Sequence, residues 1–186
     1  RDNPTGIQKM LWKHANKNGK FIKENYVNDD GRIQQKVSSY IPNNADKYTI
    51  VVTDHIRKLK AEQGMYKKQV MDKYIEYQVD LRDLVNYTFV DIVHLNRSIG
   101  SPERIKMFST VLYPTGDDVK DSGNLSEECN FMVTMFNPAD EKYNIEQHFG
   151  KAVNKFNNYR SVHIVEARGK PCPRHLQYDF FGNISY

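Results

Sequence analysis

Asp54 is the first residue of this sequence whose type and position suggest chemistry. It directly follows the mostly apolar, β-branched run 48–53, which is typical of a strand buried on both faces of a parallel sheet. Open α/β sheets bind ligands at the carboxyl ends of their strands, where a carboxylate can hold Mg²⁺ on nucleotide phosphates, often through water. A strand-end Asp is also common as a solvated residue or a helix cap, so both interpretations stay open.

His94 lies near the end of a second apolar run, 88–95, and Asn96 and Arg97 follow it. On a parallel strand beside Asp54, His94 would share the same crevice and could contact a γ-phosphate by a hydrogen bond. A structural role is the plain alternative for a single His.

The segment 96–127 is rich in Pro, Gly and charged residues and is predicted to be a long loop. Basic side chains and glycine N–H groups suit a phosphate chain. The residues of this kind in the segment are Arg97, Arg104, Lys106, Lys120 and Gly123. An ordinary solvated loop has the same composition.

Arg168 precedes Gly169 and Lys170 at the end of a further predicted strand. Its guanidinium would project from the edge of the domain. An arginine placed this way can stabilise phosphoryl-transfer charge in a neighbouring subunit, although an ordinary surface arginine fits the same pattern.

The sequence contains no phosphate loop of the form G-x-x-x-x-G-K-[ST]. Its three Gly-Lys pairs, at 19–20, 150–151 and 169–170, lack both the upstream glycine and the following Ser or Thr. No zinc-ligand spacing and no nucleophile elbow is present either. Whether the chain is an enzyme is therefore uncertain from its own residues.

Strands and helices alternate along most of the chain. Helix 68–86 has apolar residues at helical spacing and separates the runs 48–53 and 88–95, which predicts a parallel crossover. Further expected elements are a helix at 5–17 ended by Asn18-Gly19, a turn at 28–31, strands at 131–136 and 161–167, a short polar helix at 139–149 and a hairpin partner at 174–181. The expected fold class is α/β, with a mixed, mainly parallel sheet and a C-terminal antiparallel hairpin.

Composition restricts the class of protein. With 186 residues, 39% hydrophobic and 27% charged, the chain can form a globular core, and its net charge of +4 is compatible with a polyanionic partner. No apolar run approaches the ~20 residues that span a bilayer. The two cysteines, Cys129 and Cys172, suit a reducing cytoplasm, so we expect a cytoplasmic protein with no membrane partner.

In order along the chain, these motifs resemble the motor domain of DnaB-type hexameric replicative helicases. The run 50–56 resembles the Walker B strand, with His55 and Arg57 in place of Tyr and Gln. Residues 95–98, Leu-Asn-Arg-Ser, are identical to the family motif, and His94 stands where the family has its γ-phosphate-sensing Gln. The stretch 118–123 resembles Asp-Leu-Arg-Glu-Ser-Gly, whose loop contacts single-stranded DNA.

The resemblance implies a segment 46–186 that is the C-terminal half of a RecA-like motor domain, preceded by an unassigned polar segment 1–45. It implies ATP and Mg²⁺ as cofactors, a homohexamer, and single-stranded DNA as partner. Arg168 matches the family's arginine finger, with Glu166 in place of a Lys. Asp54, His94 and Arg168 would be catalytic, with Asp54 binding Mg²⁺ through water, and Arg97, Lys120 and Gly123 would bind nucleic acid.

The family's phosphate loop and catalytic Glu lie upstream of this region, which leads us to expect them before Arg1. The expected function is thus part of an NTP-driven DNA helicase motor that translocates on single-stranded DNA. The alternatives are a non-hydrolysing RecA-like nucleic-acid-binding module and another RecA-fold ATPase, such as a recombinase or a packaging motor.

Overall fold

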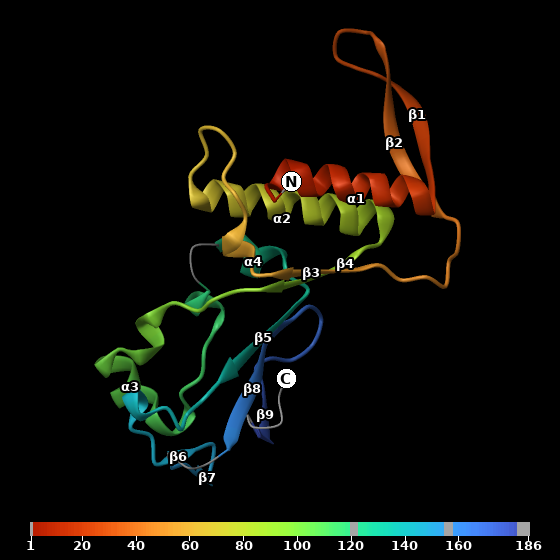
Figure 1. The fold of residues 1–186 in the computed structure, drawn as a ribbon. Coiled ribbons are helices and arrows are strands. Elements are labelled where there is room, and N and C mark those ends of the chain that lie inside the picture. Colours follow the sequence, from red (N-terminus) through yellow and green to blue (C-terminus); the bar gives the residue numbers. More distant parts are fainter. Residues whose placement is uncertain (1, 120–122, 155–157, 182–186) are drawn as a thin grey trace. The chain divides into compact units, whose positions relative to one another are not determined.

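A computed structural model describes residues 2–119, 123–154 and 158–181 of the chain (Figure 1). The chain forms two compact units, Arg1–Val93 and His94–Tyr186, and each is described by itself. No helix among the described residues is long and apolar enough to cross a membrane. The sequence predicts that a motor domain occupies 46–186 and not 1–45. This boundary is a different question from the division into two units, and it stays a prediction.

The first unit begins with helix α1 (Pro4–Asn18) and a hairpin of strands β1 (Gly19–Val27) and β2 (Ile33–Pro42). Asn3 caps the helix, because its side chain accepts a hydrogen bond from the N–H of Gly6 at 2.8 Å. The predicted helix 5–17 and the turn at 28–31 are confirmed, and Gly31 takes the left-handed φ of 74° within that turn. The hairpin itself was not foreseen, because both strands are mostly exposed and polar.

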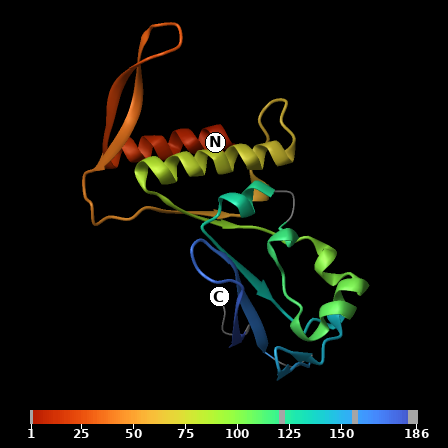
Figure 2. The same cartoon turned by 180° about the vertical axis from the view of Figure 1, so that it is seen from behind.

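Strands β3 (Ile50–Asp54) and β4 (Thr88–Ile92) form a parallel pair, joined through the 3₁₀ turn η1 (Ile56–Lys58) and helix α2 (Lys67–Val85). The predicted helix 68–86 and the parallel crossover are confirmed. Helices α1 and α2 lie side by side in both views (Figures 1 and 2). Their shared core continues onto one face of the strand pair and contains Leu11, Ala15, Leu81, Val85 and Tyr87, with Val51 and Phe89 packed against it.

Full burial of these two strands was predicted and is not found within the first unit. Along both strands exposed residues alternate with partly buried ones. The outward apolar side chains are Ile50 (63% exposed), Val52 (63%), Val90 (45%) and Ile92 (46%). A parallel sheet is normally covered on both faces, so these residues have the composition of a buried strand while only one face is covered by this unit.

The second unit is built on a three-stranded antiparallel sheet in the order β5 (Phe131–Phe136), β8 (Tyr159–Ala167), β9 (Arg174–Asp179). The predicted strands 131–136 and 161–167 and the hairpin partner at 174–181 are confirmed. A separate small ladder pairs β6 (Gln147–His148) with β7 (Lys151–Ala152). The core of the unit consists of Ile99, Leu112, Phe136, Tyr143, Ile145, Val153 and Tyr159.

Two predictions about connecting segments are wrong. The segment 96–127 is not a plain loop, because its described residues form five short helical elements. They are η2 (Arg97–Gly100), α3 (Pro102–Phe108), η3 (Ser109–Val111), η4 (Gly116–Asp118) and α4 (Gly123–Glu128). The predicted helix at 139–149 is a single 3₁₀ turn, η5 (Glu141–Tyr143), followed by β6. Asn144 ends that turn in the left-handed conformation, which stops a helix.

The described residues therefore form a mixed α/β fold with several small sheets and one parallel strand pair. A single, mainly parallel sheet, as expected from the sequence, is not present among them. The antiparallel hairpin at the C-terminal side is present as β8 and β9.

Candidate functional site

The carboxylate of Asp118 is the centre of a buried polar site in the second unit. Asp118 is 1% exposed, and Arg104 on α3 donates to both of its oxygens, at 2.5 Å to Oδ1 and 2.8 Å to Oδ2. The backbone N–H of Thr115 donates to Oδ2 at 2.8 Å, and the Oγ of Ser98 lies 3.2 Å from Oδ1. One buried side chain thus joins residues of η2, α3 and η4.

Burial alone would raise the pKa of the Asp118 carboxyl. The hydrogen bonds from Arg104 and Thr115 and the positive charge of Arg104 outweigh this effect, so the pKa lies below its usual value of 3.8. Asp118 is therefore ionised at neutral pH, and its charge is neutralised within the unit.

Hydrogen bonds also connect the segment 95–98 to the backbone around Asp118. The N–H of Asn96 donates to the carbonyl of Asp118 at 2.7 Å, and the Asn96 side chain donates to the carbonyl of Asp117 at 3.2 Å. Leu95 forms an isolated antiparallel bridge with Val119. Asn96 also caps η2, because its Oδ1 accepts from the N–H of Ser98 at 2.9 Å.

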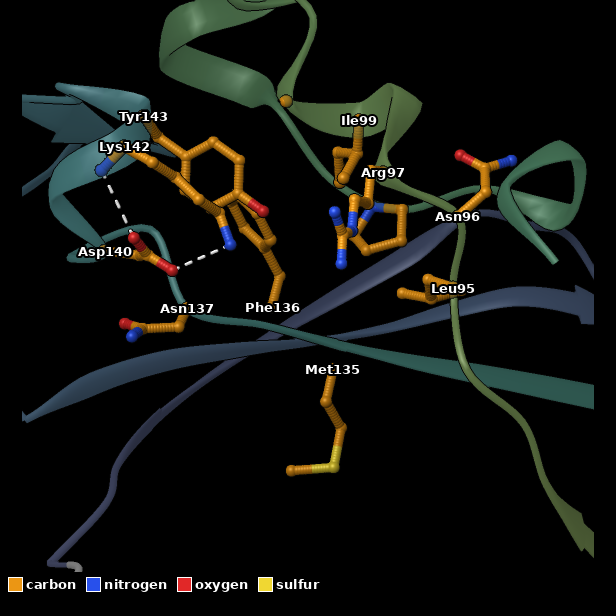
Figure 3. Close-up of a pocket in the computed structure, with 12 residues that line it drawn as sticks. Leu95, Asn96, Arg97, Ile99, Met135, Phe136, Asn137, Asp140, Lys142 and Tyr143 are labelled. Atoms are coloured by element: carbon orange, nitrogen blue, oxygen red, sulfur yellow. Dashed lines mark hydrogen bonds and ion pairs between the residues drawn. The ribbon is translucent and has the colours of Figure 1, made fainter. Parts of the chain in front are cut away.

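Arg97 is exposed although Asn96 and Ser98, its neighbours in the chain, are both tied to this centre. It lines a pocket of about 530 Å³ in the second unit. Figure 3 shows Arg97, Asn96 and Leu95 on one side of this pocket and Asn137, Asp140 and Lys142 on the other, with Phe136 and Tyr143 between. The pocket follows the carboxyl end of β5, because Phe136 is the last residue of that strand.

Charges of both signs line the pocket. The ammonium of Lys142 lies 2.8 Å from Oδ2 of Asp140 and 4.6 Å from the centre of the Tyr143 ring. Burial raises the pKa of Asp140, but the Lys142 hydrogen bonds hold it below 3.8. With Arg97 added to this pair, the pocket has a net positive side that suits a phosphate or another anion.

Asp54 is the last residue of β3 and its side chain is exposed, as expected of a strand-end carboxylate. Mg²⁺ is commonly bound by one or two carboxylates together with waters and phosphates, so a single exposed carboxylate at this position fits a water-mediated site. Among the described residues no group of three or more His, Cys, Asp and Glu side chains could hold a metal by itself. Whether Asp54 binds Mg²⁺ stays a prediction.

The sequence interpretation missed a polar network that joins helix α2 to the strands β3 and β4. Gln78 interrupts the apolar stripe of α2, and it is buried and donates to Oδ1 of Asp91 at 3.0 Å. Next to it, the hydroxyls of Thr53 and Tyr74 lie 2.8 Å apart. Burial raises the pKa of Asp91 above 3.8 although Thr53 and Gln78 bond to it. The signal in the sequence was the single polar residue in an otherwise apolar helix face.

His94 is exposed and lies beyond the end of β4, which stops at Ile92. It belongs to the second unit and Asp54 to the first, so the predicted common crevice stays a prediction. Lys120 lies outside the described residues. Gly123 is the first residue of α4.

Arg168 lies in the turn after β8, as predicted, and is exposed. Its guanidinium donates to the carbonyl of Glu127 on α4 at 3.0 Å, and its backbone N–H donates to the backbone carbonyl of Asn130 at 2.9 Å. An exposed contact of this kind is weak and exchangeable, so the arginine can bind another acceptor in its place.

The role of Arg104 differs from the sequence interpretation, which grouped this residue with those suited to a phosphate chain. The structure pairs it with Asp118 and with the carbonyl of Tyr113 at 3.2 Å. Its guanidinium is thus committed within the unit. The acidic partner at Asp118 was visible in the sequence only as part of the motif 118–123.

No protein-family model and no curated protein sequence matches this chain. Among solved structures, the chain is similar to a DnaB-like replicative helicase whose structure was described with its interactions with primase. The two are 16% identical, with a TM-score of 0.56, and the match covers 75% of this chain and 30% of the helicase chain. At this identity the similarity shows the fold alone, and the chain spans 30% of the length of that neighbour.

Proposed function

We propose that this chain forms part of an NTP-driven DNA helicase motor, which binds single-stranded DNA and translocates along it. The observation that carries the proposal is the position of Arg97. Its flanking residues are fixed to the Asp118 centre while its own side chain is exposed at a pocket with a positive side. The DnaB-like fold similarity supports the same function.

The exposed apolar face of β3 and β4 supports the RecA-like part of this proposal. Ile50, Val52 and Val90 on that face are typical of strands covered on both sides. In a RecA-like motor this pair would be part of a larger, mainly parallel sheet whose other strands and phosphate loop this chain does not supply. Such a motor would act in the cytoplasm as a homohexamer.

ATP and Mg²⁺ are the cofactors that this function requires. Mg²⁺ neutralises charge on the phosphates when bound, and Asp54 would hold it through water. His94 would contact the γ-phosphate, and Arg168 would exchange its contact with Glu127 for a nucleotide of the neighbouring subunit. Arg97, Lys120 and Gly123 would bind the DNA backbone.

Hydrolysis tests this assignment in two steps. The chain by itself should not hydrolyse ATP, because it lacks the phosphate loop that supplies N–H groups and a Lys to the phosphates. In the full assembly, Arg168→Ala should lower the rate by ~10³–10⁵ while nucleotide binding is retained. Magnesium-dependent turnover by the isolated chain that is lost in Asp54→Ala would contradict the first step.

Mixed assemblies decide whether Arg168 acts on a neighbour. An Arg168→Ala subunit with an intact phosphate loop is combined with a subunit whose phosphate loop is inactive but which keeps Arg168. Activity that neither parent has should then return at some interfaces. If mixed assemblies form and no activity returns, Arg168 is a structural surface residue.

A non-hydrolysing nucleic-acid-binding module is the second candidate. It is favoured by His94 and Glu166, which replace the Gln and Lys of the motif that the sequence resembles. This candidate predicts full single-strand binding and no ATP turnover in the full protein, and substitution of Asp54 would then leave binding unchanged.

A further inference from the structure

We infer that Asp118 is a positioning residue for nucleic-acid binding, which it controls through the conformation of the segment 95–98. This inference rests on the proposed function, because it assigns a role towards the same ligand. Asp118 is buried and cannot contact DNA itself. It can therefore influence binding through its charge or through the residues that it holds, and we infer the second.

The contacts show which residues those are. Asn96 is bound by its backbone N–H to the carbonyl of Asp118 at 2.7 Å, and Ser98 reaches the Asp118 carboxylate at 3.2 Å. These are the two neighbours of Arg97 in the chain. Asp118 is thus joined to both chain neighbours of Arg97, to Asn96 through backbone groups and to Ser98 through the two side chains, and Arg97 makes none of these contacts.

The pair with Arg104 holds Asp118 in turn. The two guanidinium nitrogens bond the two carboxylate oxygens, a geometry that fixes the orientation of the carboxylate as well as its position. Thr115 adds a backbone N–H at 2.8 Å. Removal of the negative charge weakens all of these bonds at once and leaves the Arg104 charge without its partner.

Charge and position predict opposite effects of the same substitution. If Asp118 acted only through its charge, Asp118→Asn would remove a negative charge near a polyanion and tighten binding. If it positions Arg97, the same substitution should weaken binding, because the arginine loses its fixed place. The sign of the change therefore separates the two explanations.

The experiment measures the affinity of the full protein for a single-stranded homopolymer, oligo(dT), in 0.1 M salt. Loss of one phosphate contact in Arg97→Ala should weaken binding roughly fivefold, from a salt slope of about 0.7 per contact on a single strand. Asp118→Asn should weaken it by a similar factor. The double variant should bind no more weakly than either single variant, because both changes remove the same contact.

Asp117→Asn is the matched control, since it removes the same charge from the exposed neighbouring residue. It should leave binding unchanged or slightly tighter. Ser98→Ala is the second variant in case Asp118→Asn does not fold. It removes the contacts of the Ser98 hydroxyl with Asp118 and with Asn96 and keeps the pair with Arg104, so it should weaken binding by less and in the same direction.

Each outcome decides the inference. Equal or tighter binding by folded Asp118→Asn, with weaker binding by Arg97→Ala, would overturn the positioning role and leave the proposed function standing. Additive losses in the double variant would also overturn it. If Arg97→Ala binds as well as the unchanged protein, the proposed DNA contact fails, and the role of Asp118 towards it fails with it.

Discussion

Two polar centres in the described part of the second unit differ in what holds them together. The first is the Asp118 centre, in which a carboxylate and the guanidinium of Arg104 form an ion pair. The second, which we call the histidine centre, contains His148, His163 and His175 together with Tyr159 and Ser161. It is held together by hydrogen bonds between neutral groups.

The hydrogen bonds of the histidine centre define its protonation. The carbonyl of Leu112 can only accept, so Nε2 of His148 carries a proton and donates to it at 2.6 Å, while Nδ1 accepts from the Tyr159 hydroxyl at 2.9 Å. His163 and His175 face each other across β8 and β9, with their Nδ1 atoms 2.7 Å apart. This contact is a hydrogen bond only if one of the two nitrogens carries a proton and the other lacks one.

The pKa values of the two centres differ for the same reason. Burial lowers the pKa of His163 to about 3, and the neighbouring His175 and His148 add to this effect. The pKa values of His148 and His175 are lowered as well, chiefly by burial. Burial thus keeps the histidines neutral, whereas Asp118 stays charged because the partly buried cation of Arg104 is paired with it. The comparison teaches that Asp118 keeps its charge in the interior because the sequence also supplies its partner, Arg104.

Asp118→Ala should give the largest effect on stability. The substitution leaves the Arg104 guanidinium without its partner in a mostly buried place, which costs about 3–5 kcal/mol of the free energy of unfolding. The measurement is native-state hydrogen exchange of β5 and β8 amides, which reports on the second unit. Asp117→Ala, at an exposed position, should change this free energy by less than about 0.5 kcal/mol. Equal effects of the two substitutions would contradict the role of the ion pair.

As the pH is lowered, the histidine centre should lose stability at a higher pH than the Asp118 centre. The folded pKa of His163, about 3, is below the unfolded value of 6.5, so its contribution is complete above pH 6.5 and is lost as the pH falls towards 3. The slope should be about 1.4 kcal/mol per pH unit between roughly pH 6 and 4 for this one proton. The Asp118 pair should be lost only as the pH falls below the usual carboxyl pKa of 3.8.

His163→Gln sharpens this comparison, because the amide keeps a donor and an acceptor but does not titrate. Its free energy of unfolding should depend less on pH between 6 and 4, whatever its value at pH 7. A stability of the unchanged protein that is constant over this range would show that the histidines are not held neutral.

Tyr113→Leu should give the smallest effect. The Tyr113 ring stacks on His163 with ring centres 4.8 Å apart, whereas only its backbone carbonyl accepts from Arg104. Loss of the ring should therefore cost roughly 1 kcal/mol of stability and leave binding of oligo(dT) unchanged. A loss of binding comparable to that of Arg97→Ala would mean that the two centres are not separate.

The sequence predicts the elements whose apolar residues repeat with a clear period. Helix α2, strand β5 and the β8–β9 hairpin lie where their patterns indicate. It fails for the hairpin β1–β2, whose exposed strands have no such pattern, and for the helical turns in 96–127, which are fixed by caps and by the Asp118 centre.

The candidate site divides in the same way. Arg97 and Arg168 are exposed next to element ends, as their positions in the sequence predict. The partner of Arg104 could not be predicted, because Asp118 is 14 residues away in the chain and the exposed Asp117 stands beside it. Only the folded chain shows which of two adjacent carboxylates is buried.

The salt dependence of single-strand binding tests the central claim most directly. The affinity of the full protein for oligo(dT) is measured between 50 and 200 mM salt for the unchanged protein, for Arg97→Ala and for Arg32→Ala, which removes an equal charge from the exposed turn of the first unit. A phosphate contact by Arg97 predicts a slope of log K against log salt that is reduced by about 0.7 in Arg97→Ala. Arg32→Ala should keep the full slope. Equal slopes for all three proteins would contradict the assignment of this segment to DNA binding.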